Sequence, residues 1–346
     1  MSGKLGIAIL GLAHSHAEPW ARGIASDPRA RLAAVWDTDA QRGKAFALRF
    51  GARFAQTVGE AIGPADVCAV AITSEHSLRP RLVTAACEAG KHILCEKPMA
   101  TTLDGCGQIA RAVDMSGVTF MQAFQMRHDP VNIHVRDLVR DGSLGRVGII
   151  YKRHSHSYGL DGWPNGRDEW FFDPSVAGGG AGMDQLIHSC DWLRWVFGEP
   201  RSVSAQMRTM LKRGRVEDNI TATFSLVDGP LAVLHSSWTE IAGTVTTQIF
   251  GDEGTIIQMY SDLASSRPDR PHDSPLLVYR IGNNGWQRPI VREGFGRAHE
   301  AVVEAFITCL IEGTPPSAGV ADGEKAVAMV LAAYEAAQRK REVLLA

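Results

Sequence analysis

Glu96 and Lys97 form an acid–base pair at the end of an apolar run. Residues 92–95 predict a strand that is buried on both faces, and Pro98 must end it because proline donates no ladder hydrogen bond. Open parallel sheets bind their ligands at the carboxyl ends of their strands, so we expect this pair to enter a binding site. The alternative is an ordinary surface ion pair at a strand end.

A second pair, Asp184 and His188, lies on a helix predicted over residues 183–197, after the tight turn that the glycines at 178–180 allow. Together with Asp191 they share one helical face. A histidine one turn from a carboxylate can act as a general base whose tautomer and pKa are held by that neighbour. A lone histidine on a helix is more often structural, but its combination with the first pair favours a catalytic role.

The elements that must position these pairs begin with a strand, a glycine turn and a helix. Residues 5–10 predict a buried strand and residues 17–25 a helix, the order found in dinucleotide sites. The turn is an incomplete G-x-G-x-x-G motif, because Ala13 and His16 stand at its second and third glycine positions. Alanine leaves room for a pyrophosphate, whereas His16 must point away from the helix–strand contact or touch the ligand. The residues expected to contact the cofactor here are Gly11, Leu12, Ala13, His14, Ser15 and His16.

Asp37 follows a second predicted strand, over residues 32–36, about 20 residues after His16. An acid at this distance accepts hydrogen bonds from the adenosine ribose hydroxyls and repels a ribose phosphate. It therefore favours NAD over NADP, although the nearby Arg42 weakens that preference. The alternative is that Asp37 caps the helix predicted over residues 38–50.

Strands and helices then alternate with short connections. The further strands are predicted over residues 67–72, 92–95 and 118–124, and the helices over residues 78–89 and 101–115. This pattern predicts an α/β domain with a doubly wound parallel sheet that closes near residue 125. Thr73 and His76, at the end of one strand, are further candidates for cofactor contact, and so are Glu96 and Lys97 at the end of the next.

The turn at 11–16, Asp37, and the blocks at 89–98 and 178–188 together resemble the glucose–fructose oxidoreductase and inositol dehydrogenase (Gfo/Idh/MocA) family of NAD(P)-dependent oxidoreductases. The resemblance covers nearly the whole chain. It implies an N-terminal Rossmann domain over residues 1–125 and a C-terminal α+β domain over residues 126–346. In that family Glu-Lys-Pro closes the nucleotide domain, and the peptide bond before the proline is often cis.

The resemblance also implies how the residues act. As a hypothesis, His188 removes the proton of a substrate hydroxyl while Lys97 hydrogen-bonds the same oxygen and stabilises the charge that develops on it. Asp184 orients His188 or holds a neighbouring hydroxyl, and Glu96 positions Lys97. The substrate lies between the sheet of the second domain and the nicotinamide.

A long strand predicted over residues 147–157 opens the sheet of the second domain, after a helix over residues 130–141. Its period of two places Arg153 with Ser155 and Ser157 on one face and His154 with His156 and Tyr158 on the other. One face is expected to meet the substrate, and the sequence does not decide which. The histidines at 154, 156 and 188 have no spacing that demands a metal ion, and none is expected.

Residues 159–177 mix aromatic and charged side chains without periodicity, as a loop that folds over a ligand often does. Trp163 and Trp170 suit a sugar ring, and Arg167 suits hydroxyl or carboxylate groups. The alternative is that these aromatic residues pin the loop to the core. The expected substrate residues are Arg127, Arg153, His156, Trp163, Arg167, Trp170, Asp184 and His188.

The remainder predicts a large, mostly antiparallel sheet with one open face. Strands are predicted over residues 221–227, 231–238, 245–250 and 255–260, and helices over residues 298–311 and 321–339. In the resembling family the open face is a subunit contact, which implies a homodimer or homotetramer.

Composition narrows the class of partner. The 346 residues carry a formal charge of −2, so no global field attracts nucleic acid or an anionic membrane. The six cysteines form no CxxC pair, and neither a signal peptide nor a membrane-spanning run is recognised, which favours a cytoplasmic protein.

The sequence thus predicts an oxidoreductase that transfers a hydride between a secondary alcohol of a sugar, inositol or related polyol and NAD, with NADP as the alternative cofactor. Two other classes remain: a glycosidase or lyase that retains NAD through transient oxidation, and a non-catalytic sugar or nucleotide sensor.

Overall fold

The computed structural model describes residues 3–163, 169–212, 215–241, 245–260, 276–282, 285–290 and 298–345. The chain forms two compact units. The first comprises Met1–Gln125, Ser175–Gly178 and Arg297–Val327, and the second comprises Met126–Pro174, Gly179–Gly296 and Ala328–Ala346. A segment close to the C-terminus therefore belongs to the N-terminal unit.

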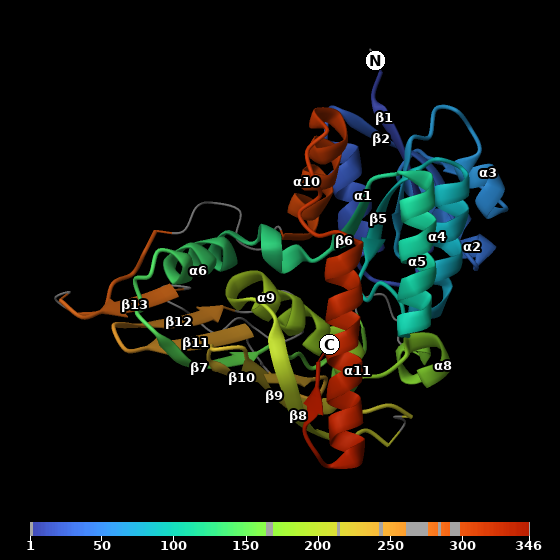
Figure 1. Cartoon of the computed structure of the whole chain (residues 1–346). Coiled ribbons are helices and arrows are strands. Elements are labelled where there is room, and N and C mark those ends of the chain that lie inside the picture. The colour runs from blue at the N-terminus through green and yellow to red at the C-terminus, as the bar shows by residue number, and fades with distance from the viewer. Residues whose placement is uncertain are drawn as a thin grey trace. The chain divides into compact units, whose positions relative to one another are not determined.

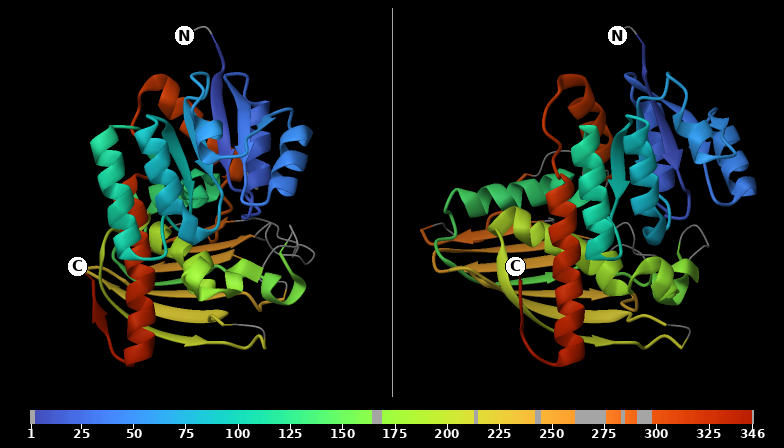
Figure 2. Two further views of the ribbon diagram at one scale, coloured as in Figure 1. Left: turned by 90° about the vertical axis from the view of Figure 1, so that its right-hand side faces the viewer. Right: turned by 45° about the vertical axis from the view of Figure 1, so that its right-hand side comes forward.

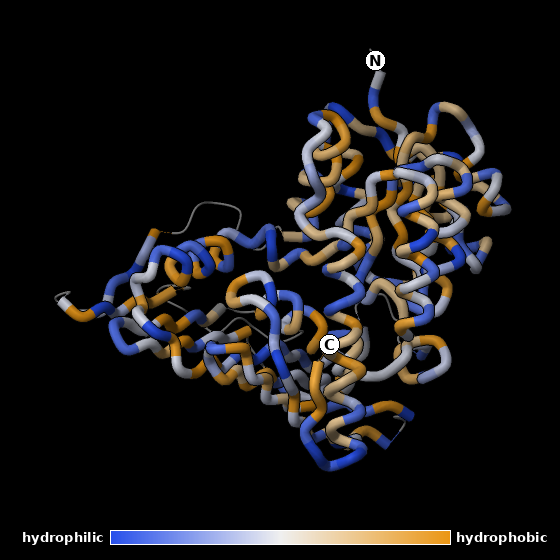
Figure 3. Tube along the Cα trace, in the orientation of Figure 1, coloured by the Kyte–Doolittle hydropathy of each residue, from blue (hydrophilic) through white to orange (hydrophobic). Residues whose placement is uncertain are grey.

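The first unit is built on a parallel sheet, as the sequence predicted, and this sheet has six strands (Figure 1). Its strand order is β3-β2-β1-β4-β5-β6, which is the order of a dinucleotide-binding sheet. β4 and β5 are buried along nearly their whole length, because helices cover both faces of such a sheet. Figure 3 shows the hydropathy of the chain in the same orientation as Figure 1. The strands are β1 (Leu5–Leu10), β2 (Ala30–Trp36), β3 (Arg53–Phe54), β4 (Ala69–Ile72), β5 (His92–Glu96) and β6 (Phe120–Ala123).

Two groups of helices pack on this sheet. Side chains of α1, α2 and α10 share one hydrophobic core with β1 and β2. The helices α4 and α5 contact each other and lie side by side (Figure 2). β3 and α3 were not predicted, because two and five residues are too few to show a period. The helices are α1 (Ala17–Ser26), α2 (Ala40–Arg49), α3 (Val58–Ile62), the 3₁₀ turn η1 (His76–Leu78), α4 (Arg79–Glu88), α5 (Leu103–Ser116) and α10 (Ala298–Glu312).

The second unit is built on an eight-stranded sheet of order β13-β12-β11-β7-β10-β9-β8-β14. Among the described strand pairs of this second sheet, only β7 and β10 are parallel, which confirms the predicted mostly antiparallel sheet. The strands are β7 (Val147–Arg153), β8 (Pro200–Arg208), β9 (Asn219–Leu226), β10 (Leu231–Ser237), β11 (Val245–Gly251), β12 (Gly254–Tyr260), β13 (Leu276–Arg280) and β14 (Val343–Leu344).

Strand β7 is shorter than predicted, because the chain after Arg153 leaves the regular ladder. The amides of His154 and His156 still donate to the carbonyl oxygens of His235 and Ser237, each at 2.9 Å. The prediction of a strand through residue 157 was therefore wrong, although the predicted alternation of side chains persists up to His156.

The helical segments of the second part of the chain include one π-helical turn, η4 (Gly182–Leu186), directly before α9 (Ile187–Phe197). Among the described residues, no helix has the length and apolar character needed to cross a membrane. The other segments are η2 (Gln125–His128), α6 (Pro130–Arg140), α7 (Tyr158–Asp161), η3 (Glu169–Phe172), α8 (Pro174–Ala177) and α11 (Val320–Arg339).

Gly11 follows β1 in a left-handed conformation, with φ of +84°. A Cβ atom at this position would lie 2.5 Å from the Cα and Cβ atoms of Ser74, at the end of β4. Only glycine therefore lets the turns after β1 and β4 approach each other.

We predict that Gly11→Ala lowers the thermal unfolding midpoint of the chain more than Gly117→Ala does. Gly117 is also left-handed, with φ of +65°, but a Cβ there meets no atom within 4 Å. Gly117→Ala is therefore destabilised only by the left-handed backbone conformation, by about 1–2 kcal/mol, whereas Gly11→Ala adds a clash with the main chain. Equal losses in the two variants would contradict this explanation.

Candidate active site

The turns after β1 and β4 are bonded to each other at the point where the strand order reverses. The amide of His14 donates to the carbonyl oxygen of Thr73 at 3.1 Å, and the Thr73 hydroxyl donates to the carbonyl oxygen of Gly11. Ala13 is buried and Ser15 is half-buried. Open α/β sheets bind ligands at this reversal point, so the predicted cofactor turn lies where a dinucleotide is expected.

Asp37 organises the same turn from the end of β2. Its carboxylate accepts from the amides of Leu12 and Asp39, each at 2.6 Å, and from the guanidinium of Arg42 at 2.5 Å. The cap of α2 is Asp39, which accepts from the amides of Gln41 and Arg42. The alternative interpretation of Asp37 as that cap is therefore wrong.

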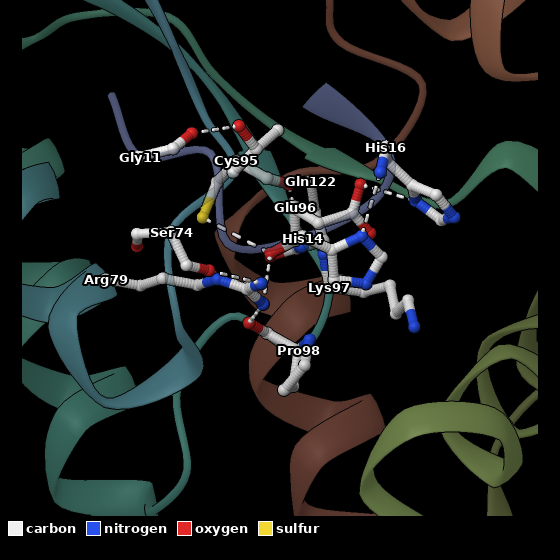
Figure 4. A network of polar contacts seen from close by, with 11 residues as sticks. Gly11, His14, His16, Ser74, Arg79, Cys95, Glu96, Lys97, Pro98 and Gln122 are labelled. Atoms are coloured by element: carbon white, nitrogen blue, oxygen red, sulfur yellow. Dashed lines mark hydrogen bonds and ion pairs between the residues drawn. The ribbon is translucent and has the colours of Figure 1, made fainter. Parts of the chain in front are cut away.

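Glu96 is a buried carboxylate that joins the two predicted cofactor segments. One oxygen lies 3.0 Å from Nδ1 of His16, and the other accepts from the Lys97 amide at 3.0 Å (Figure 4). Burial by itself raises the pKa of this carboxyl group, but the neighbouring His16, Lys97 and Arg79 outweigh it and hold the pKa below its ordinary value. His16, which the motif had left with two choices, thus points to Glu96 from the N-terminus of α1.

Arg79 is a fully buried residue that the sequence analysis did not single out. Its guanidinium donates to the carbonyl oxygens of Ser74 at 3.0 Å, Glu96 at 2.9 Å and Pro98 at 2.5 Å. Figure 4 shows the Lys97 side chain extending away from this guanidinium. The peptide bond between Lys97 and Pro98 is cis, as the family resemblance implied.

His76, the remaining predicted cofactor residue, is fully buried, and its Nδ1 lies 2.8 Å from the carbonyl oxygen of Ala177. This bond connects η1 to the short helix α8. The structure thus gives His76 a contact within the first unit that a sequence pattern cannot indicate.

One group of possible metal ligands occurs in the described part of the chain, and it is not the one considered from the sequence. Ligand atoms of His14, His16 and Glu96 lie within 4.8 Å of one another. Nδ1 of His14 already accepts from the His16 amide at 3.2 Å, and His16 already contacts Glu96. These internal bonds compete with coordination, so we assign no metal to the group.

In the second unit, Asp184 and His188 occupy the π-helical turn and the start of α9. The Asp184 carboxylate accepts from Nε1 of Trp238 at 2.9 Å and lies 3.5 Å from Nε2 of His156. The His188 ring lies 5.0 Å from the ring of His154, measured between centroids. Because π-turns occur frequently at functional sites, this irregularity supports the region chosen from the sequence.

Asp191, the third residue of the predicted face, has a different partner. It receives a two-pronged ion pair from Arg127, with distances of 2.9 and 2.6 Å, and both side chains are buried. This pair anchors α9 to η2. The guanidinium of Arg127, which was predicted to bind substrate, thus pairs with the Asp191 carboxylate of the same unit.

Residues of both faces are buried after the end of β7, because Ser155 and Ser157 are as inaccessible as the histidines beside them. Lys152, His154 and His156 are buried on one face, whereas Arg153 is half-buried on the other and lies 3.5 Å from Glu240. Arg153 and His156 lie on different faces of this alternation, and both remain predicted substrate residues.

Lys152 is an unusual buried cation next to α9. Its ammonium group lies 4.3 Å from the ring centroid of Trp192 and donates to the Thr247 hydroxyl at 3.0 Å. Burial lowers the pKa of Lys152 to about 7, and only Asp129 opposes this shift.

The predicted aromatic platforms lie in a second hydrophobic core. Trp163 is 6% exposed and stacks on Phe171 at 4.8 Å, with Trp238 edge-on at 5.1 Å. Trp170 is half-buried and stacks on Phe171 at 3.8 Å. These contacts favour the alternative interpretation, in which the aromatic residues pin the loop. Arg167 lies outside the described residues.

Models of a single family match both units. The model described as an oxidoreductase family with an NAD-binding Rossmann fold matches residues 5–124, and the model of the GFO/IDH/MocA C-terminal domain matches residues 133–257. The chain belongs to the Gfo/Idh/MocA family. Its first unit is an NAD-binding Rossmann domain, and the protein is an oxidoreductase.

Individual relatives agree with this membership. The chain is 26% identical over 324 residues to the 1,5-anhydro-D-fructose reductase of Ensifer adhaerens, covering 93% of each chain. It is 29% identical over 324 residues to an inositol 2-dehydrogenase of Acidothermus cellulolyticus, covering 88% of this chain and 84% of the relative.

Two solved structures are similar over nearly the full length of both chains. The aldose-aldose oxidoreductase of Caulobacter crescentus, crystallised with glycerol, is 27% identical with a TM-score of 0.84, covering 99% of this chain and 100% of that chain. GenD2 of gentamicin A biosynthesis, crystallised with NAD, is 25% identical with a TM-score of 0.83, covering 100% and 97%.

The residues of the first unit fit NAD. Gly11 leaves no side chain at the tight approach to Ser74, and Asp37 stands at the end of β2, where an acid meets the adenosine ribose. The N-cap of α1, His16, makes no capping hydrogen bond with its side chain, so the helix N-terminus keeps its attraction for a pyrophosphate.

We predict that Asp37→Asn lowers the ratio of the NADP to the NAD dissociation constant by about tenfold or more, or about 1.4 kcal/mol in relative binding. The substitution removes the charge that repels a ribose phosphate and releases Arg42 to pair with that phosphate. Fluorescence titration of both cofactors measures the ratio. Asp39→Asn, which alters the neighbouring cap, serves as the control and should leave the ratio unchanged; an unchanged ratio in Asp37→Asn would contradict the assignment.

Proposed function

We propose that the chain is a dehydrogenase that moves a hydride between a secondary alcohol of a sugar, inositol or related polyol and NAD. The observation that carries this proposal is the placement of Lys97 directly after β5 of the NAD-binding unit, beside the buried Glu96 carboxylate. The names of the relatives, a sugar reductase and an inositol dehydrogenase, support the same substrate class.

NAD, when bound, supplies the hydride acceptor. Lys97 donates a hydrogen bond to the alcohol oxygen and stabilises the negative charge that develops there. Glu96 accepts from the Lys97 amide and so fixes the main chain from which the ammonium extends. The cation is thereby held in position before substrate binds.

His188 accepts the hydroxyl proton on an imidazole nitrogen. Asp184 is held by the indole of Trp238 and by the neighbouring amide of Gln185, at 2.9 and 3.0 Å. A carboxylate fixed in this way can orient the imidazole or accept a second substrate hydroxyl, as the sequence analysis proposed. Its negative charge also stabilises a protonated imidazole.

The substrate is proposed to be uncharged. Arg127 and Lys152 are buried basic residues of the second unit. The Arg127 guanidinium pairs with Asp191, and the Lys152 side chain donates to the Thr247 hydroxyl and lies over the Trp192 ring. Each of the two groups thus has a partner within its own unit, and neither is assigned to a substrate carboxylate or phosphate. A neutral polyol fits these residues better than a sugar acid.

We also propose that copies of the chain associate through the open face of the eight-stranded sheet. Tyr151, Leu231, Phe250 and Tyr279 are exposed apolar residues on its strands, with Tyr151 and Phe250 in ring contact at 6.4 Å. A homodimer or homotetramer would cover them. All six cysteines are free and most are buried, which supports a cytoplasmic location.

We predict that Lys97→Met lowers kcat by about 10²- to 10³-fold, the usual effect of losing one group that stabilises an oxyanion. The dissociation constant for NAD should change only a few fold. The test screens NAD with inositols, neutral sugars and sugar acids by absorbance of the reduced cofactor, and then compares the variant on the best neutral substrate.

Lys44→Met removes an exposed lysine of α2 and is the matched control, which should retain the parental rate. Turnover within a few fold of the parent in Lys97→Met would show that the assignment is wrong. Faster turnover of sugar acids than of every neutral polyol would overturn the proposal of an uncharged substrate.

A further inference from the structure

The π-helical turn that carries Asp184 begins without a cap of its own. Its N-cap residue is Ala181, which has no side-chain acceptor. The first intrahelical bond is the donation of the Asp184 amide to the Gly180 carbonyl oxygen at 3.0 Å. The amides of residues 180–183 therefore need partners from elsewhere, because the first donors of any helix have none inside it.

Glu217 satisfies three of these four amides. Its carboxylate accepts from Gly180 at 3.0 and 3.1 Å and from Gly182 at 2.8 Å, and its main-chain carbonyl oxygen accepts from Ala181 at 3.0 Å. Glu217 lies just before β9, far along the chain from the turn that it caps. A buried carboxylate at a helix N-terminus also interacts favourably with the helix dipole.

Tyr334 of α11 satisfies the fourth amide. Its hydroxyl oxygen accepts from Met183 at 3.0 Å and donates to the Glu217 carboxylate at 2.7 Å. Burial and the adjacent Glu217 raise the pKa of Tyr334 well above its ordinary value, so the hydroxyl stays protonated and keeps donating. The two side chains act as one cap made from two distant segments.

The glycines of the turn are explained by this cap. A Cβ at Gly180 would lie 1.7 Å from the Glu217 carbonyl oxygen, and a Cβ at Gly182 would lie 2.7 Å from the Tyr334 hydroxyl oxygen. The glycines of this block therefore leave the space that Glu217 and Tyr334 occupy. Sequence analysis had assigned it only the role of a tight turn.

The segment that contains Glu217 is also connected to the side chain of Asp184. The carbonyl oxygen of Asp218, next to Glu217, accepts from the main-chain amide of Trp238 at 2.9 Å. The Trp238 indole in turn donates to the Asp184 carboxylate at 2.9 Å. Glu217 and Asp218, directly before β9, thus bind both the main chain that precedes Asp184 and the tryptophan that donates to the Asp184 carboxylate.

We propose that Glu217 and Tyr334 are positioning residues for the reaction, which set the place of Asp184 and, through the turn, of His188. This inference rests on the proposed function, because it concerns the segment that carries the proposed base. Neither residue needs to touch the substrate. Their effect is on the rate of the proton-transfer step and not on cofactor binding.

Tyr334→Phe and Glu217→Gln test the proposal with little change in side-chain volume. We expect each to lower kcat about 10- to 100-fold with a KM for the polyol within about threefold of the parent, the pattern of an interaction used in the transition state. NAD affinity should stay at the parental value. The double variant should lose less than the product of the two single losses, because the two side chains share one hydrogen bond.

Glu253→Gln changes an exposed carboxylate of the turn between β11 and β12 in the same unit and is the matched control, with parental kcat expected. Hydrogen exchange gives a second readout that does not depend on turnover. The amides of residues 180–183 should exchange faster in both variants, while those of α6 keep their parental rates.

The outcomes separate the two levels of the proposal. Faster exchange at residues 180–183 together with parental kcat would overturn the positioning role, and so would unchanged exchange and unchanged kcat. A loss of kcat that merely follows a fall in the folded fraction, with α6 exchanging faster as well, would also overturn it. A parent protein that turns over no polyol would overturn the proposed function itself.

Discussion

The buried guanidinium of Arg79 is the constraint on which the cofactor unit depends. It donates to the carbonyl oxygens of Ser74, Glu96 and Pro98. These bonds join the end of β4 to the end of β5 and bind the main chain on both sides of the residue that carries the proposed reactive ammonium group. A guanidinium remains charged throughout the physiological pH range and presents its donors in a fixed fork, which holds the three carbonyls in one arrangement. Its loss would leave buried acceptors unsatisfied, at about 1–3 kcal/mol for each group. The direction of Lys97 therefore depends on a residue with no proposed part in the chemistry.

The second unit follows the same principle with different groups. The proposed base lies on a helix that is fixed at one point by the ion pair between Arg127 and Asp191, and at its start by the carboxylate of Glu217. In each unit a buried charged side chain satisfies main-chain groups near a proposed reactive residue: Arg79 does so beside Lys97, and Glu217 does so beside Asp184. Such groups restrict motion at the places where a chemical step needs fixed geometry.

Features of this structure that depend on neighbouring residues in the sequence could be predicted, and features that depend on contacts between distant segments could not. β1, α1 and the strand that ends in Glu96 were predicted with small errors, because apolar runs and glycine turns are local signals. Arg79, Glu217 and Tyr334 were missed because each acts on main-chain groups that only the tertiary fold brings near. The face of β7 that carries His156 was left open for the same reason, and the predicted strand end was wrong because a strand's partners, not its own residues, decide where its ladder stops.

Transfer of hydride from a polyol carbon to released cofactor is tested most directly with an isotopic label. A polyol deuterated at its ring carbons is incubated with NAD and the enzyme, and the released cofactor and the product are analysed by mass spectrometry. We predict one deuterium on the reduced nicotinamide for each ketone formed. Consumption of the polyol with no deuterium in the released cofactor would contradict a dehydrogenase and would indicate a glycosidase or lyase that retains its NAD.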